Sequence, residues 1–231
     1  MAAFAVMVKT PGFSPVKSRL AEGLGVEGAE KIYRQCLDCM GEILQDLQGE
    51  DSVFACWAVA EESALESPLW AKFPRVHQNG LGLGERMASV INELRPVHGR
   101  VALVGADSPQ LGPEIVRQAF SILEDETSGA DVVLGPSVDG GFYLIAMLVE
   151  LPLALWNAVE YSRSDTLEQF VEQCRRQAPQ VVIDTKTLPI LCDLDQQADL
   201  APMLRALKNR AGATARQLYQ TLQERLNHAT I

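Results

Sequence analysis

The sequence of 231 residues lacks most of the patterns that would place it in a specialised class of protein. It has only three histidines, and none stands at a spacing that would suggest a zinc site. No serine or cysteine triad pattern is evident. The apolar N-terminal run 2–8 is too short to span a membrane, and no basic start or cleavage site marks it as a signal peptide. These absences predict a cytoplasmic protein without a membrane span.

The cysteines are few and odd in number, at five, which indicates free thiols in a reducing compartment rather than a disulfide framework. Cys36 and Cys39 form a lone C-x-x-C with no second pair. Zinc or redox chemistry is one interpretation of this pair. The other, which we favour, is that both side chains face the core of a helix.

Positive charge is outnumbered by negative charge, with 20 Lys and Arg against 30 Asp and Glu, which gives a formal net charge of −10. An acidic surface repels the phosphates of nucleic acids and anionic lipids, which excludes extended nucleic acid as an expected partner. A small phosphorylated ligand remains compatible with this charge if Lys and Arg side chains, or a metal ion, gather at one place.

Apolar runs of strand length alternate with helical patterns along the whole chain. Several runs are continuously apolar, as in strands buried on both faces, and lie at 4–8, 53–59, 101–104, 132–134, 142–147 and 181–183. Helical spacing is found at 29–47, 85–94, 113–123, 166–176 and 213–226. This alternation predicts a layered α/β sandwich in one domain, 1–231. The last helix is expected either to pack on the sheet or to mediate a homodimer.

Open α/β sheets bind ligands at the carboxyl ends of their strands, so the residues that follow each strand carry the functional signal. The loop after the first strand holds three cations, Lys9, Lys17 and Arg19, which suit a pyrophosphate. Its Pro11 and Gly12 indicate a defined turn, and the Walker A spacing is absent. The alternative is an ordinary solvated basic loop.

A second segment, 78–87, places alternating glycines directly before a helix. Such glycines allow a backbone to approach a ligand closely, and a helix N-terminus favours anions. The spacing differs from the G-x-G-x-x-G dinucleotide pattern. The predicted binding residues are Gly82, Gly84 and Arg86, and the alternative is a plain turn before a helix.

A third segment runs from a short apolar strand into Gly105, Ala106 and Asp107. Carboxylate oxygens suit Mg²⁺ or Mn²⁺, and the two small residues leave room for a nucleotide. Asp193 and Asp195 lie on one side of an extended segment and are candidates for further metal ligands. The alternative for each of these aspartates is a helix N-cap.

The fourth segment, 134–144, carries Asp139 followed by Gly140 and Gly141. Asp-Gly is a strong hairpin signal, so a plain connection is one interpretation. In the other interpretation, Asp139 lies beside bare backbone and holds a sugar or an acceptor hydroxyl.

Together these segments resemble a bacterial family, DUF2064, whose members are regarded as glycosyltransferase-like and related to nucleotide-diphospho-sugar transferases. The resemblance rests on 9–12, 17–20, 83–87, 105–109 and 135–144 in this order. It implies a GT-A fold, which is a three-layer α/β/α sandwich with a mostly parallel mixed sheet. It further implies a nucleotide-sugar or nucleoside triphosphate donor, Mg²⁺ or Mn²⁺, and Asp107 as the metal-binding aspartate. The sequence departs from the pattern at Gly105, which removes an Asp-x-Asp, and at Ser18, where threonine is expected.

The sequence therefore predicts a metal-dependent glycosyltransferase that moves a sugar from a nucleotide-diphospho-sugar to a small-molecule acceptor. Lys9, Lys17 and Arg19 would stabilise the phosphates, and Asp139 would orient the sugar or act as base. One alternative is a nucleotidyltransferase that transfers a nucleoside monophosphate from a nucleoside triphosphate to a small phosphorylated or sugar acceptor. Another is a catalytically silent nucleotide-binding protein.

Overall fold

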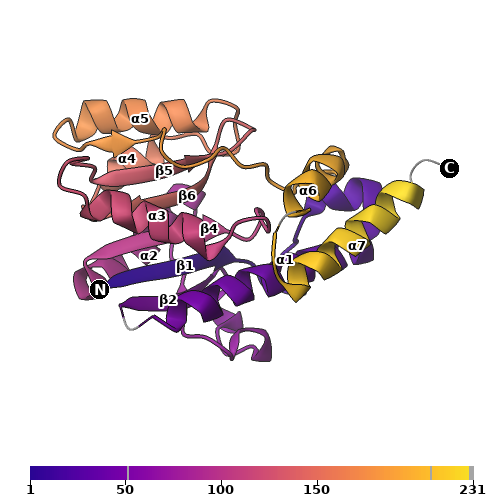
Figure 1. Ribbon diagram of the computed structural model, residues 1–231. Helices are drawn as coiled ribbons and strands as arrows, with labels where there is room; N and C mark the ends of the chain where they lie inside the picture. Colours follow the sequence, from indigo (N-terminus) through magenta and orange to yellow (C-terminus); the bar gives the residue numbers. More distant parts are fainter. Residues whose placement is uncertain (51, 209, 229–231) are drawn as a thin grey trace.

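The computed structural model describes residues 1–50, 52–208 and 210–228 and has a seven-stranded sheet at its centre (Figure 1). The order in the sheet is β3-β2-β1-β4-β6-β5-β7. Strand β6 runs antiparallel to both of its neighbours, and the other pairings are parallel. The predicted mostly parallel mixed sheet is thus confirmed. Its strands are β1 (Ala2–Val8), β2 (Val53–Val59), β3 (Arg75–His77), β4 (Arg100–Gly105), β5 (Val132–Pro136), β6 (Phe142–Met147) and β7 (Ile183–Asp184).

Helices cover both faces of the sheet and bury alternate side chains of each strand. Phe4 and Val6 of β1 pack in the cluster formed with α1 and α3, whereas Ala3 and Ala5 pack in the cluster formed with α2, α4 and α5. Burial on both faces explains why the strands are continuously apolar in sequence. The covering helices are α1 (Ser18–Gln48) and α3 (Pro113–Glu124) on one face, and α2 (Leu83–His98), α4 (Leu153–Asn157) and α5 (Thr166–Gln177) on the other.

The C-terminal helices α6 (Leu200–Leu207) and α7 (Ala213–His228) lie beside α1 and away from the strands (Figure 1). They bury a second apolar stripe of α1, which includes Ile32, Cys36 and Cys39. Of the two alternatives expected for the last helix, packing on the sheet is therefore wrong, because α7 packs on α1. Both cysteines are buried and unpaired, which confirms the helix-core interpretation.

Short and irregular elements account for the other differences from the predicted pattern. Elements this short contain too few residues for a periodic pattern to appear, so they were not predicted. They are strand β3, helices α4 and α6, and the 3₁₀ turns Glu62–Ala64, Pro68–Trp70 and Gln197–Asp199. Helix α1 begins earlier than its apolar stripe, since its first turns are mostly exposed and its backbone is interrupted at Gly25 (φ +73°). Among the described helices, none combines the length and hydrophobicity of a membrane span.

Candidate active site

A cavity of about 570 Å³ opens at the carboxyl ends of β1 and β4. From β1 the chain continues to β2 on one side, whereas β4 lies on the other side, so this is the point where the strand order reverses. Ligands of open α/β sheets bind in such crevices, and the volume suits a small molecule. The predicted site residues that line it are Lys9, Lys17, Arg19, Arg86, Gly105, Ala106, Asp107, Asp139, Gly141, Asp193 and Asp195.

The remaining predicted residues lie outside the cavity wall, and these are Pro11, Gly12, Gly82, Gly84 and Gly140. Two of these glycines have a packing role. A Cβ on Gly84 would lie 2.6 Å from the carbonyl oxygen of Trp156, so this glycine lets α2 approach α4. Gly140 has φ +88°, and a Cβ there would overlap the carbonyl oxygen of Ser164.

The loop after β1 is held in place from two sides. The hydroxyl of Tyr33 accepts a hydrogen bond from the Lys9 amide and donates one to the Lys9 carbonyl, both at 2.9 Å. Burial raises the pKa of Tyr33, so the hydroxyl keeps the proton that it donates. On the other side, Trp70 Nε1 donates to Thr10 Oγ1 at 3.1 Å. This double anchorage fixes Lys9 at the cavity.

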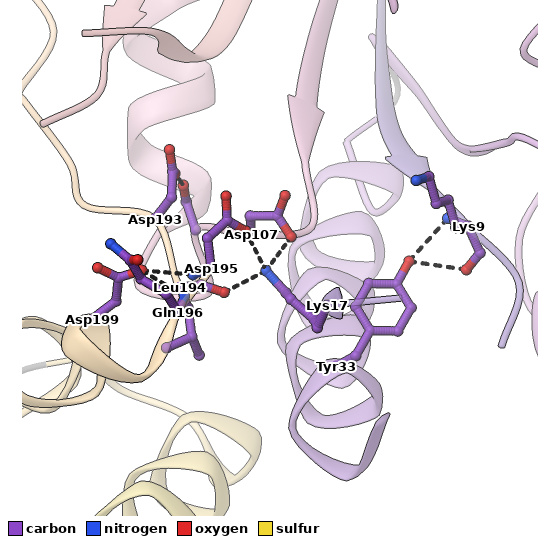
Figure 2. Close-up of polar contacts among 10 residues, drawn as sticks. Lys9, Lys17, Tyr33, Asp107, Asp193, Leu194, Asp195, Gln196 and Asp199 are labelled. Atoms are coloured by element: carbon purple, nitrogen blue, oxygen red, sulfur yellow. Dashed lines mark hydrogen bonds and ion pairs between the residues drawn. The ribbon is translucent and has the colours of Figure 1, made fainter. Parts of the chain in front are cut away.

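Lys17 lies at the acidic side of the cavity, with its ammonium surrounded by oxygen atoms (Figure 2). Its Nζ donates to Asp107 Oδ1, to the carbonyl of Leu194 at 2.5 Å and to Asp195 Oδ1 at 3.2 Å. The Lys17 side chain is 3% exposed, whereas those of Asp107 and Asp195 are 45% and 38% exposed. Burial is the largest single influence on the pKa of Lys17 and would lower it. The charges of Asp107 and Asp195 and the hydrogen bond to Asp107 are the main opposing influences, and the pKa lies above its usual value.

These bonds use all three donors of the ammonium, so in this arrangement Lys17 has none left for a phosphate. Lys9 and Arg19 differ from it. Within the part of the chain that the structure describes, neither side chain has a hydrogen bond or an ion pair, and both residues are exposed at the cavity. The three cations that are neighbours in sequence therefore have different surroundings.

Asp193 and Asp195 are brought to Asp107 by the backbone. The Leu194 amide donates to the carbonyl of Asp107 at 2.9 Å, which holds the segment 193–195 against the end of β4. Ser108 Oγ donates to Asp193 Oδ1 at 2.5 Å. Burial, aided by the charges of Asp107 and other nearby aspartates, raises the pKa of Asp193 to about 6, even though the Ser108 bond lowers it.

None of these three aspartates caps a helix, so the capping alternatives are wrong. Helix α3 begins after Gly112, well beyond Asp107. The turn Gln197–Asp199 begins after Gln196, which forms a capping box with Asp199. The carboxylates of Asp107, Asp193 and Asp195 are instead directed at the group of polar contacts around Lys17 and Ser108.

Asp139 lies in the hairpin loop that joins the antiparallel strands β5 and β6, as the Asp-Gly signal predicts. Its Oδ1 accepts a hydrogen bond from the Gly141 amide at 3.0 Å. The residue is exposed, and its charge contributes to the raised pKa of Asp193. Asp139 therefore faces the same cavity as the aspartates that follow β4 and β7.

Several cavity residues were not among the predicted site residues, and these include Tyr33, Gln78, Ser137, Tyr161, Ser162 and Arg163. Gln78 is buried, and its Nε2 donates to the carbonyls of Val8 at 3.1 Å and Ala58 at 2.6 Å, at the ends of β1 and β2. Ser162 has φ +62°, a conformation that is rare outside glycine and concentrates at functional sites. Its place at the start of the glycine segment 78–87 was the signal that could have pointed to Gln78.

The oxygen donors around Lys17 are of the kind that Mg²⁺ and Mn²⁺ prefer, namely the carboxylates of Asp107, Asp193 and Asp195 and the carbonyl of Leu194. Their chemistry fits a divalent metal. In the described residues, however, no group of three or more His, Cys, Asp or Glu side chains is arranged to hold an ion. In the present arrangement the oxygens of Asp107, Leu194 and Asp195 hold an ammonium group instead.

Solved structures of other proteins share this fold. A protein of Desulfovibrio desulfuricans G20, provisionally described as a nucleotide-diphospho-sugar transferase, is 28% identical with a TM-score of 0.77, over 99% of this chain and 95% of that one. CMP:2-keto-3-deoxy-manno-octonic acid synthetase, solved with CTP, shares the fold at 13% identity and a TM-score of 0.51, over 89% of this chain and 97% of that one.

Among curated proteins no sequence matches the chain. The family described as "Uncharacterized protein conserved in bacteria (DUF2064)" matches residues 42–163, which is over half of the chain and runs from α1 past α4. Those residues include Asp107, Asp139 and the glycine segment before α2. The chain therefore belongs to the DUF2064 family.

Proposed function

We propose that this protein is a transferase that binds a nucleotide-diphospho-sugar in the cavity and transfers its sugar to a small-molecule acceptor. We also propose that residues 1–231 act as one domain. The observation that carries the proposal is the cavity itself. It lies where the strand order reverses, and the unpaired cations Lys9 and Arg19 line it together with Asp107 and Asp139. The 28% identity to a protein provisionally described as such a transferase supports it.

The pyrophosphate of the donor would lie against Lys9 and Arg19. Both side chains are free of protein partners among the described residues, so a ligand can use their charges without breaking a bond. Charge-assisted hydrogen bonds from such groups are about twice as strong as neutral ones. As the bond to the sugar breaks, negative charge grows on the leaving nucleoside diphosphate, and these cations stabilise it.

Asp139 is placed to act on the sugar or on the acceptor hydroxyl. Its Oδ1 is held by the Gly141 amide, which fixes the orientation of the carboxylate while the residue stays exposed to the cavity. A fixed carboxylate can accept a hydrogen bond from a sugar hydroxyl, or take the proton of an acceptor hydroxyl as general base. Gly105 and Ala106, at the end of β4, leave space for the nucleotide beside it.

If Mg²⁺ or Mn²⁺ binds here, Asp107, Asp193 and Asp195 are the residues that would hold it. A metal in this position supplies positive charge next to the donor phosphates and so stabilises the leaving group. The oxygen donors suit such an ion in their chemistry, and the raised pKa of Asp193, about 6, still leaves this carboxylate mostly ionised at neutral pH.

The test is a product assay on the purified protein with a panel of nucleotide-diphospho-sugars, each mixed with small hydroxyl and phosphate acceptors and Mn²⁺. Phosphorus NMR distinguishes nucleoside diphosphate from pyrophosphate as the released product. We expect acceptor-dependent release of nucleoside diphosphate from at least one donor. A combined Lys9→Met and Arg19→Met variant should lose this activity, whereas Lys31→Met, which changes an exposed lysine of α1, should keep it.

The same assay separates the alternatives. Pyrophosphate release from a nucleoside triphosphate would replace the proposal with nucleotidyl transfer, an activity that the shared fold also accommodates. Tight nucleotide binding without either product, across all common donors, would show a catalytically silent nucleotide-binding protein.

A further inference from the structure

Lys17 lies where an ion shared by Asp107 and Asp195 would have to lie. Its Nζ contacts one oxygen of each carboxylate and the Leu194 carbonyl, which together form an oxygen-only set of partners (Figure 2). Oxygen-only sets of this kind otherwise bind hard cations such as Mg²⁺ and Mn²⁺. The ammonium and a divalent ion cannot occupy the same position.

The backbone positions Lys17 for this contact. Lys17 is the residue before α1 and has φ +50° and ψ +43°, the left-handed conformation that residues other than glycine rarely adopt. The strain is compensated by the surrounding structure, as is common at functional sites. It directs a side chain that is 3% exposed into a cluster whose carboxylates are half-exposed at the cavity. The enclosed member of the cluster is therefore the lysine.

Asp107 and Asp195 each retain a second oxygen. Within the described residues, neither Asp107 Oδ2 nor Asp195 Oδ2 accepts a hydrogen bond, and both residues line the cavity. A charged ligand entering the cavity thus meets two carboxylates that an internal cation already neutralises in part.

We propose that Lys17 is the resident cation of this cluster, and that a divalent metal reaches Asp107 and Asp195 only when Lys17 Nζ withdraws from them. The proposal deepens the proposed function and rests on it in so far as that function places a metal here. Withdrawal would free three N–H donors of Lys17 at the cavity, and a phosphate could accept hydrogen bonds from them.

Metal and nucleotide would then bind cooperatively through Lys17. A phosphate that accepts hydrogen bonds from the freed ammonium favours the state in which Lys17 has withdrawn. The metal favours the same state. Each ligand must therefore raise the affinity for the other by the same factor. Without Lys17, this part of the coupling disappears.

The test measures Mn²⁺ binding directly, by electron paramagnetic resonance of the free ion, in the absence of any sugar donor. The variants are Lys17→Met, the charge-matched control Arg19→Met at the same cavity, and the remote control Lys31→Met. We expect Lys17→Met to bind Mn²⁺ at least about tenfold more tightly than the wild type, a difference of about 1.4 kcal/mol. Arg19→Met removes an equal charge without opening the position and should change affinity by less than about threefold.

A second titration adds UDP or GDP. In the wild type the nucleotide should tighten Mn²⁺ binding, and in Lys17→Met the tightening should be smaller. Circular dichroism and thermal melting establish that each variant is folded, and Lys17→Gln, which retains a hydrogen-bond donor, replaces Lys17→Met if the latter does not fold.

Equal Mn²⁺ affinity in the wild type and the Lys17 variant, or no Mn²⁺ binding to either, would overturn the exchange. So would an equal gain in Arg19→Met, because the effect would then be one of net charge. No turnover enters this measurement, so a failure of the transferase proposal, seen as the absence of product, remains distinguishable from a failure of the exchange.

Discussion

Two parts of the cavity wall carry opposite charges and differ in how far the protein itself satisfies them. On the acidic side, Asp107 and Asp195 accept hydrogen bonds from Lys17, and Asp193 accepts one from Ser108. On the basic side, Lys9 and Arg19 have no ion-pair partner among the described residues.

The difference separates charge used in folding from charge available to a ligand. Lys17 and the carboxylates compensate one another, so removing either partner affects the fold first. Lys9 and Arg19 are left unpaired in a chain of net charge −10, where acidic partners are abundant. An anionic ligand that enters the cavity would meet uncompensated positive charge at Lys9 and Arg19.

The largest expected effect comes from removing the internal cation. Lys17→Met leaves Asp107 and Asp195 without their shared partner, and breaking a buried ion pair costs about 3 to 5 kcal/mol. Because the carboxylates that remain are partly exposed and stay hydrated, we expect less than this, about 2 to 3 kcal/mol of unfolding free energy. Urea unfolding in the presence of a metal chelator measures it, with Lys31→Met as control. A loss below about 0.5 kcal/mol would show that the acidic side does not depend on Lys17.

The next effect concerns Asp193, whose folded-state pKa of about 6 lies above the usual 3.8. The stability contributed by its protonated form is fully present below pH 3.8 and is lost as the pH rises through about 6. Asp193→Asn stays neutral, so it should be more stable than the wild type by about 2 kcal/mol at pH 8 and equally stable near pH 4. Urea unfolding between pH 4 and 8 tests this, with the exposed Asp46→Asn as control. A pH-independent difference would contradict the raised pKa.

The smallest effect is expected on the basic side. Lys9→Met and Arg19→Met should each weaken binding of UDP or GDP about tenfold, since a hydrogen bond to a charged group contributes about 1.5 to 3 kcal/mol. Neither should change the unfolding free energy by more than about 0.5 kcal/mol, because both side chains are exposed and unpaired. Isothermal titration calorimetry and urea unfolding measure the two quantities. A large loss of stability with unchanged nucleotide affinity would reverse the comparison between the two sides.

The strands and the family resemblance were predictable because they depend on local patterns. Strand β1 reads as a continuous apolar run since Phe4 and Ala3 are buried on opposite faces. Helix α7 was predicted from its own periodicity. Its position was not, because a helical period shows that a helix has an apolar face but not which other element that face contacts. Short elements such as β3 have too few residues for a period to show.

The candidate site likewise has features that the sequence predicts and features that it does not. The sequence determined that Lys9, Lys17, Asp107 and Asp139 follow strands, and strand ends meet at one edge of an α/β sheet. A strand-end position does not reveal which charges pair. Lys17 contacts Asp107 and Asp195, which are 90 and 178 positions away in sequence. Those contacts exist because β1 lies beside β4 and because the Leu194 amide bonds to the Asp107 carbonyl.

The sequence by itself thus determined the kinds of residue at the cavity, since polar residues must follow buried strands. Only the tertiary structure decided that one of three neighbouring cations is enclosed and two are free. Coulomb energy depends on the separation of the charges and on their exposure to water, and both are set by sheet order and loop packing rather than by spacing along the chain.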